Sequence, residues 1–162
     1  MELEADHTFE APPHEVVDAM VDPGFAEQLV ALPDVSDVEV IGSGQEAARR
    51  WLSVRMVYGG SLDPIAAKVL GSSSPSWIQT YRLDRPGVPG ELEITPEHHG
   101  SLLTCRAEIV VSEHPDGTRR TLRGELSVRV PLVGGKAERA LAPAIRRRID
   151  VEAQLLARWL GR

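Results

Sequence analysis

The sequence has few of the residues on which redox or nucleic-acid chemistry depends. Cys105 is the only cysteine, so no internal disulfide can form and a cytoplasmic location is expected. Only seven residues are aromatic and the net charge is −6. Nucleic-acid binding needs a basic surface, and single strands also need exposed aromatic side chains. We therefore expect no nucleic-acid partner.

Long apolar runs and targeting segments are also missing. No stretch approaches the roughly 20 consecutive apolar residues of a membrane-spanning helix, so membrane insertion is not expected. The acidic start, MELEADHT, does not have the pattern of a signal peptide. With 162 residues, of which 42% are hydrophobic and 26% charged, residues 1–162 are expected to form one soluble domain.

The C-terminal part of the chain has the clearest periodicity, and it predicts one long helix over residues 135–160. The apolar residues recur at helical spacing and form one stripe: Leu141, Ala142, Ile145, Ile149, Ala153, Leu156, Trp159 and Leu160. Pro143 cannot donate a backbone hydrogen bond, so either the helix kinks there or it begins near this residue. A helix with a single apolar face needs a wide apolar surface to pack against.

The same region carries an excess of positive charge. From residue 131 onward there are seven Lys or Arg against three acids, which gives this tail about +4 and the rest of the chain about −10. We interpret this as a solvated helix face, partly paired with acidic strands, in preference to a site for an anionic partner. A domain that binds a protein partner through this face or through a sheet edge is a further hypothesis.

Seven segments alternate apolar and polar residues with the period of half-buried strands. They cover residues 2–10, 35–41, 50–58, 77–83, 92–94, 103–111 and 122–130. Proline-initiated short helices are predicted at 14–20, at 22–32 and, after Asp63 as N-cap, at 65–70. Turns predicted at Gly42-Ser43-Gly44 and Asp116-Gly117 join consecutive strands, which favours a mostly antiparallel sheet.

This order of elements, with HTFEAPPHEVVDAMVDP near the start and VRVPLVGGK before a helix that ends in ARWL, resembles the START-like (SRPBCC, pollen-allergen-like) helix-grip superfamily. More narrowly, it resembles an uncharacterised bacterial family of that superfamily. The resemblance covers essentially the whole chain. It implies an α+β fold in which a curved seven-stranded antiparallel sheet wraps around the C-terminal helix, with two short helices between the first two strands. Superfamily members bind lipids, sterols, polyketides or hormones, and some are cyclases or aromatases.

Our first functional hypothesis is a cavity that binds or carries a small hydrophobic molecule, such as a lipid or polyketide, without a cofactor. Small residues facing inward (Ala5, Cys105, Ala107 and Gly124) would leave space under the helix, or they would pack a solid core. The residues expected to contact the ligand are Tyr58, Trp77, Tyr81, Cys105, Ala107, Leu126, Ile145 and Ile149. The helix around residues 64–70 could act as a mouth or lid.

The alternative is an enzyme of the cyclase or aromatase type, with His7, Tyr58 or Tyr81 as acid–base groups. His7 is otherwise expected to be a hydrogen-bonded histidine of the core. We identify no nucleophile, because Cys105 lies in the middle of an apolar strand.

Two further motifs are better explained by structure than by chemistry. Glu97-His98-His99 has no third ligand at a zinc-like spacing, so a metal site is not expected. The GSGQEA motif matches a dinucleotide fingerprint, but a strand follows it in place of the helix that would bind the pyrophosphate.

Overall fold

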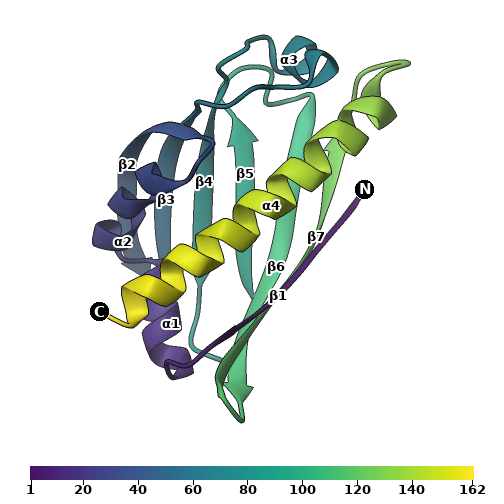
Figure 1. The fold of residues 1–162 in the computed structure, drawn as a ribbon. Helices are drawn as coiled ribbons and strands as arrows, with labels where there is room; N and C mark the ends of the chain where they lie inside the picture. The colour runs from purple at the N-terminus through teal and green to yellow at the C-terminus, as the bar shows by residue number, and fades with distance from the viewer.

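Seven antiparallel strands form one curved sheet, and a long helix lies across one face of it (Figure 1). The computed structural model describes residues 1–162. The strands are β1 (Glu2–Phe9), β2 (Val35–Glu46), β3 (Arg49–Tyr58), β4 (Ser76–Leu83), β5 (Gly90–Pro96), β6 (Leu103–His114) and β7 (Gly117–Val128). Their order in the sheet is β1-β7-β6-β5-β4-β3-β2, a meander to which β1 adds by pairing with β7. The predicted α+β helix-grip fold is confirmed.

Four α-helices and one short 3-10 helix connect and cover these strands. They are α1 (Pro13–Met20), α2 (Pro23–Glu27), η1 (Gln28–Ala31), α3 (Pro64–Leu70) and α4 (Gly134–Leu160). The segment predicted as one helix at 22–32 is thus divided between α2 and η1. Asp22 and Asp63 cap α2 and α3, because their carboxylates accept hydrogen bonds from backbone N–H groups of the first turn.

Helix α4 contains the predicted long helix and packs against both ends of the molecule. It runs without interruption through Pro143, so a helix that begins near this residue is wrong. Pro143 lies on the exposed side of α4. The N-terminal half of α4 contacts α3, and the C-terminal half contacts α1 (Figure 1). At that second end the rings of Phe25 and Trp159 pack with their centroids 5.9 Å apart.

The turn predicted at Gly42-Ser43-Gly44 is wrong. Strand β2 continues to Glu46, and the chain reverses at Ala47, whose φ is 55°. The two glycines serve another purpose, since the Trp51 indole of β3 lies over them. A Cβ atom on either Gly42 or Gly44 would lie 2.9 Å from an atom of that ring. Glycine is therefore present here because a side chain packs closely against the backbone. The alternation of apolar and polar residues along the strand does not reveal this contact.

The small inward residues pack the core and do not line a cavity. Ala5, Cys105 and Ala107 are buried within one continuous apolar core. A Cβ atom on Gly124 would lie 2.5 Å from Ala107 Cα on the neighbouring strand, so glycine is required by strand packing. Of the two alternatives, these residues therefore pack a solid core, and the cavity between the sheet and α4 is lined by other residues.

Candidate functional site

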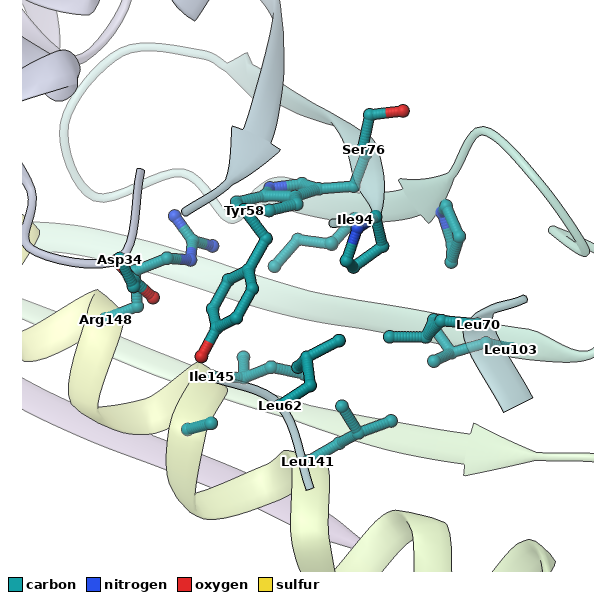
Figure 2. A pocket seen from close by; sticks show the side chains of 14 residues that line it. Asp34, Tyr58, Leu62, Leu70, Ser76, Ile94, Leu103, Leu141, Ile145 and Arg148 are labelled. Carbon is teal, nitrogen blue, oxygen red and sulfur yellow. The ribbon is translucent and has the colours of Figure 1, made fainter. Parts of the chain in front are cut away.

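A cavity of about 90 Å³ lies between the sheet and α4, at the end of the molecule where α3 sits (Figure 2). Most of the residues around it are apolar. The lining residues are Asp34, Tyr58, Leu62, Leu70, Pro75, Ser76, Trp77, Ile94, Pro96, Leu103, Leu141, Ala144, Ile145 and Arg148.

Apart from Asp34, which precedes β2, three parts of the chain form the walls of this cavity. Strands β3 to β6 contribute inward-facing side chains near the ends of the strands, among them Trp77 and Ile94. Helix α4 contributes Leu141, Ile145 and Arg148, whose spacings of four and three residues place them on one face. The third wall comes from residues 59–75, which contain α3 and connect β3 to β4.

The α3 segment is attached to the rest of the protein mainly by a few apolar contacts. Ala66 and Val69 are its buried residues, while Leu62 and Leu70 on either side are half-buried and line the cavity. Gly71 ends α3 in the left-handed conformation, with φ of 71°. The cavity is therefore covered by a short segment with limited packing of its own.

A buried polar network crosses from β4 to α4 directly beside the cavity. Arg148 Nη2 donates to Gln79 Oε1 over 2.7 Å, and Arg148 Nη1 lies 3.4 Å from Glu152 Oε2. Tyr81 Oη donates to Glu152 Oε1 over 2.7 Å, and Gln79 Nε2 also donates to this carboxylate. All four side chains are buried, Arg148 being 6% exposed. Isolated charges are costly to bury, and here each charge is paired and hydrogen-bonded.

Arg148 and Trp77 form a stacked pair in the cavity wall. The guanidinium carbon lies 5.3 Å from the centroid of the indole ring, a cation–π arrangement. The indole Nε1–H is buried and has no hydrogen-bond acceptor within the protein. The hydrogen bonds of Arg148 to Glu152 and Gln79 use Nη1 and Nη2, while Nε makes none.

Burial keeps the nearby Tyr81 and Cys105 in their neutral forms. The pKa of Tyr81 is raised well above its usual value, first by burial and then by the negative charge of Glu152. Burial also raises the pKa of the Cys105 thiol to about 11. Neither side chain is therefore ready to act as a base or nucleophile at neutral pH.

His7 belongs to a separate group between β1, β7 and α4. Arg120 Nη2 donates to His7 Nδ1 over 3.1 Å, which leaves the ring proton of the neutral form on Nε2, 2.8 Å from Asp150 Oδ1. Burial, and after it the charge of Arg120, lowers the pKa of His7. Arg120 is itself only 1% exposed and lies over the Phe9 ring. His7 is thus a hydrogen-bonded histidine, and it does not line the cavity.

The predicted ligand-contacting residues are divided between the cavity and the core. Tyr58, Trp77 and Ile145 line the cavity. The other five, Tyr81, Cys105, Ala107, Leu126 and Ile149, are buried in the core and are absent from its lining. Their contact with a ligand stays a prediction.

Sequence reasoning missed the polar part of this site. Arg148 is buried, so the interpretation of the basic tail as a solvated face is wrong for this residue. The sequence did indicate their position, because helical spacing places Arg148 and Glu152 on the same face of α4 as Ile145 and Ile149. Gln79 likewise shares the inward side of β4 with Trp77 and Tyr81, two residues apart along the strand.

The two motifs set aside on sequence grounds have structural roles. Glu97 accepts hydrogen bonds from Arg55 Nε at 2.8 Å and from the Ser76 hydroxyl. No group of three or more His, Cys, Asp or Glu side chains is arranged to hold a metal ion. GSGQEA lies in β2 and the turn after it, and β3 follows. None of the helices has the length and apolar character needed to cross a membrane.

Solved structures share this architecture at low sequence identity. TTHA0849 from Thermus thermophilus is 17% identical, with a TM-score of 0.69 over 99% of this chain and 97% of its own. The Zhui aromatase/cyclase from Streptomyces sp. R1128 is 14% identical, with a TM-score of 0.69 over 100% and 94%. Ara h 8.0201 is 8% identical, with a TM-score of 0.65 over 99% and 97%. At these identities the likeness shows the fold alone.

Sequence comparison places the chain in a family. No curated protein sequence matches it. The model of one family, described as "Protein of unknown function (DUF2505)", matches residues 4–160. The chain therefore belongs to the DUF2505 family, and it folds as a helix-grip domain.

Proposed function

We propose that this protein, as a member of the START-like superfamily, binds and carries a small hydrophobic molecule in the cavity beneath α3. The observation that carries the proposal is the cavity itself, an apolar space between sheet and helix with a few polar groups in its wall. Such concave, mostly apolar sites with a small number of placed polar groups are typical of ligand pockets. The single cysteine favours a cytoplasmic site of action.

The size of the cavity argues that α3 moves when a ligand binds. A cavity of about 90 Å³ is smaller than the roughly 150 Å³ that accepts benzene and far smaller than the roughly 300–1,000 Å³ of drug-sized pockets. The segment 59–75 supplies one wall and buries only Ala66 and Val69 of its helix, so it is the part that can be displaced at least cost. We infer that it acts as a lid.

The geometry favours binding over catalysis of the aromatase/cyclase type. Of the three candidate acid–base groups, His7 and Tyr81 lie outside the cavity lining. Tyr58 lines the cavity, but its hydroxyl donates to the Ser61 carbonyl oxygen over 3.0 Å. General acid–base catalysis needs a group within reach of the substrate proton, and the Asp34 carboxylate is the other group of the lining that could exchange a proton.

Ligand retention and titration test the proposal. Native mass spectrometry of freshly purified protein is expected to detect a retained small molecule, and at least one member of a panel of fatty acids and aromatic polyketides is expected to change tryptophan fluorescence through Trp77. Ala144→Phe, which fills the cavity from α4, should abolish this response. Ala157→Phe, on the exposed side of the same helix, should preserve it. Absence of retained ligand and of any saturable response across the panel would refute the proposal.

A further inference from the structure

We propose that the cavity selects neutral molecules that end in a carbonyl or similar hydrogen-bond acceptor, which pairs with the N–H groups of Trp77 and Arg148. This inference rests on the proposed function, since it names the chemical class of ligand for the same cavity. It follows from the donors left unpaired in the wall and from the charges that surround them.

Two N–H groups in the wall have no hydrogen-bond acceptor in the protein. Trp77 Nε1–H is buried without an acceptor, and Arg148 Nε makes no hydrogen bond in the protein. Leaving a buried donor such as the Trp77 N–H without a partner is unfavourable, so a ligand that supplies an acceptor to it makes a hydrogen bond that the empty site lacks. The two groups belong to stacked side chains, 5.3 Å apart from guanidinium carbon to ring centroid, and both residues line the cavity.

The hydroxyl groups of the lining do not compete for this role, because both are already hydrogen-bonded within the protein. The Ser76 hydroxyl points away from the cavity, toward Glu97 (Figure 2). The Tyr58 hydroxyl donates to Ser61. The rest of the wall, apart from Asp34, is carbon, so the ligand body must be apolar and its acceptor must lie at the Trp77–Arg148 end.

The charges of the wall disfavour an anionic ligand. Arg148 is the only cation in the lining, and its charge is already balanced by Glu152 at 3.4 Å. Asp34 adds a second carboxylate to the same wall, and Figure 2 shows it at the same end of the cavity as Arg148. A carboxylate ligand would thus enter a site with no net positive charge and would lose its hydration without compensation. A neutral carbonyl avoids this cost, and the site therefore favours ketones, esters or amides over fatty-acid anions.

Three probes of equal heavy-atom number isolate the acceptor and the charge. Acetophenone carries a neutral carbonyl, isopropylbenzene replaces its oxygen by a methyl group, and benzoate adds a negative charge. The ¹H–¹⁵N spectrum of the full chain contains three indole N–H signals, and Trp77→Phe identifies the one from Trp77. Acetophenone is expected to bind more tightly than the other two, to move the Trp77 signal downfield to a saturating value, and to leave the Trp51 and Trp159 signals in place.

Variants measure the contribution of the indole donor. Trp77→Phe keeps an aromatic ring but removes the N–H, and it should lower the preference for acetophenone over isopropylbenzene by roughly threefold to tenfold. Trp51→Phe, on the opposite face of the sheet from α4, should leave that preference unchanged. The Trp77 signal of the unmodified protein remains a readout even if Trp77→Phe is poorly folded.

The possible results distinguish failure of the ligand selectivity from failure of hydrophobic binding itself. If isopropylbenzene or benzoate binds as tightly as acetophenone, the selectivity inference is wrong and hydrophobic binding stands. If acetophenone binds without moving the Trp77 signal, the assignment of the acceptor to this indole is wrong. If no probe and none of the larger ligands binds, the proposed function fails, and the inference fails with it.

Discussion

His7 Nε2 donates to Asp150 Oδ1 over 2.8 Å and so joins the first strand to the last helix across 143 positions of the chain. The same ring accepts a hydrogen bond from Arg120 through Nδ1, so both nitrogens are used by the neutral form. A second proton would place a charged imidazolium against the buried guanidinium of Arg120. The contact therefore depends on His7 staying neutral.

This arrangement predicts a loss of stability in mild acid. The pKa of His7 is lowered in the folded protein, whereas an unfolded histidine titrates near 6.5. Between these two values the unfolded chain binds more protons than the folded protein. The contribution of His7 to the free energy of unfolding is therefore complete above pH ~6.5, and it is lost as the pH decreases through the folded pKa. Asp150 and Asp6 oppose the shift, and burial and Arg120 outweigh them.

His7→Gln tests this dependence because the amide can still accept from Arg120 and donate to Asp150 without titrating. Urea denaturation between about pH 7 and pH 5 is expected to show a shallower loss of stability in this variant than in the unmodified protein. His14→Gln, on the exposed side of α1, should keep the original slope. Equal slopes in all three proteins would show that His7 does not titrate differently on folding.

The buried pair of Arg148 and Glu152 predicts a large asymmetry between single and double substitutions. Glu152→Gln leaves the guanidinium buried without its counter-charge, and breaking a buried ion pair in this way costs about 3–5 kcal/mol. Arg148→Met combined with Glu152→Gln removes both charges and should cost clearly less than Glu152→Gln alone. The free energies of unfolding from urea titrations measure the difference.

An exposed residue on the same helix provides the control for these variants. Arg158→Met should change stability by less than about 0.5 kcal/mol, since Arg158 faces solvent. A Glu152→Gln variant as stable as Arg158→Met would mean that the network is hydrated and that its charges do not depend on each other.

The parts of the molecule that were predictable from sequence are those that repeat a period. Alternation along the strands and the 3.6-residue stripe of α4 are imposed by burial on one face, so they located the sheet and the helix that it grips. Asp116-Gly117 marked a hairpin because glycine is needed there, at φ 128°. Local sequence was sufficient wherever local geometry decided the outcome.

Features that depend on contacts between distant residues were not predictable in this way. Gly42 and Gly44 have the sequence pattern of a turn, but glycine is needed at both positions because the Trp51 ring of the paired strand packs against them. The position of the cavity depends on where residues 59–75 cover the sheet, which no periodicity encodes. Arg148 belongs to the basic tail that was interpreted as a solvated face, and its partner Gln79 lies 69 positions away in the sequence.

Glycine substitutions in two environments are expected to have opposite effects. Gly124→Ala places a Cβ atom 2.5 Å from Ala107 Cα within the sheet and should destabilise the protein by about 3 kcal/mol, because two paired strands must separate. Gly135→Ala lies in the exposed first turn of α4, where the nearest atom is Arg139 Nη1 at 3.6 Å. Alanine is the better helix former, so this variant should gain roughly 0.5–1 kcal/mol.

Thermal unfolding followed by circular dichroism compares the two glycine variants directly. A rise in melting temperature for Gly135→Ala and a fall for Gly124→Ala are expected. A mild effect of Gly124→Ala would show that β6 and β7 can move apart at this pair, contrary to the close approach of their backbones.

Cys105 provides a chemical measure of how tightly the sheet and α4 stay together. Burial raises its pKa to about 11, so at pH 8 only about 0.1% of the thiol is ionised, compared with about 24% for an exposed cysteine of pKa ~8.5. Alkylation by iodoacetamide should therefore be slower in the native protein by at least roughly 100-fold than in urea, because only the thiolate reacts. Mass spectrometry of timed samples measures both rates on the same single site.

Rapid labelling of a protein that keeps its native circular dichroism would contradict the burial of β6 beneath α4. If labelling is slow and Glu152→Gln accelerates it, the polar network contributes to holding the helix on the sheet.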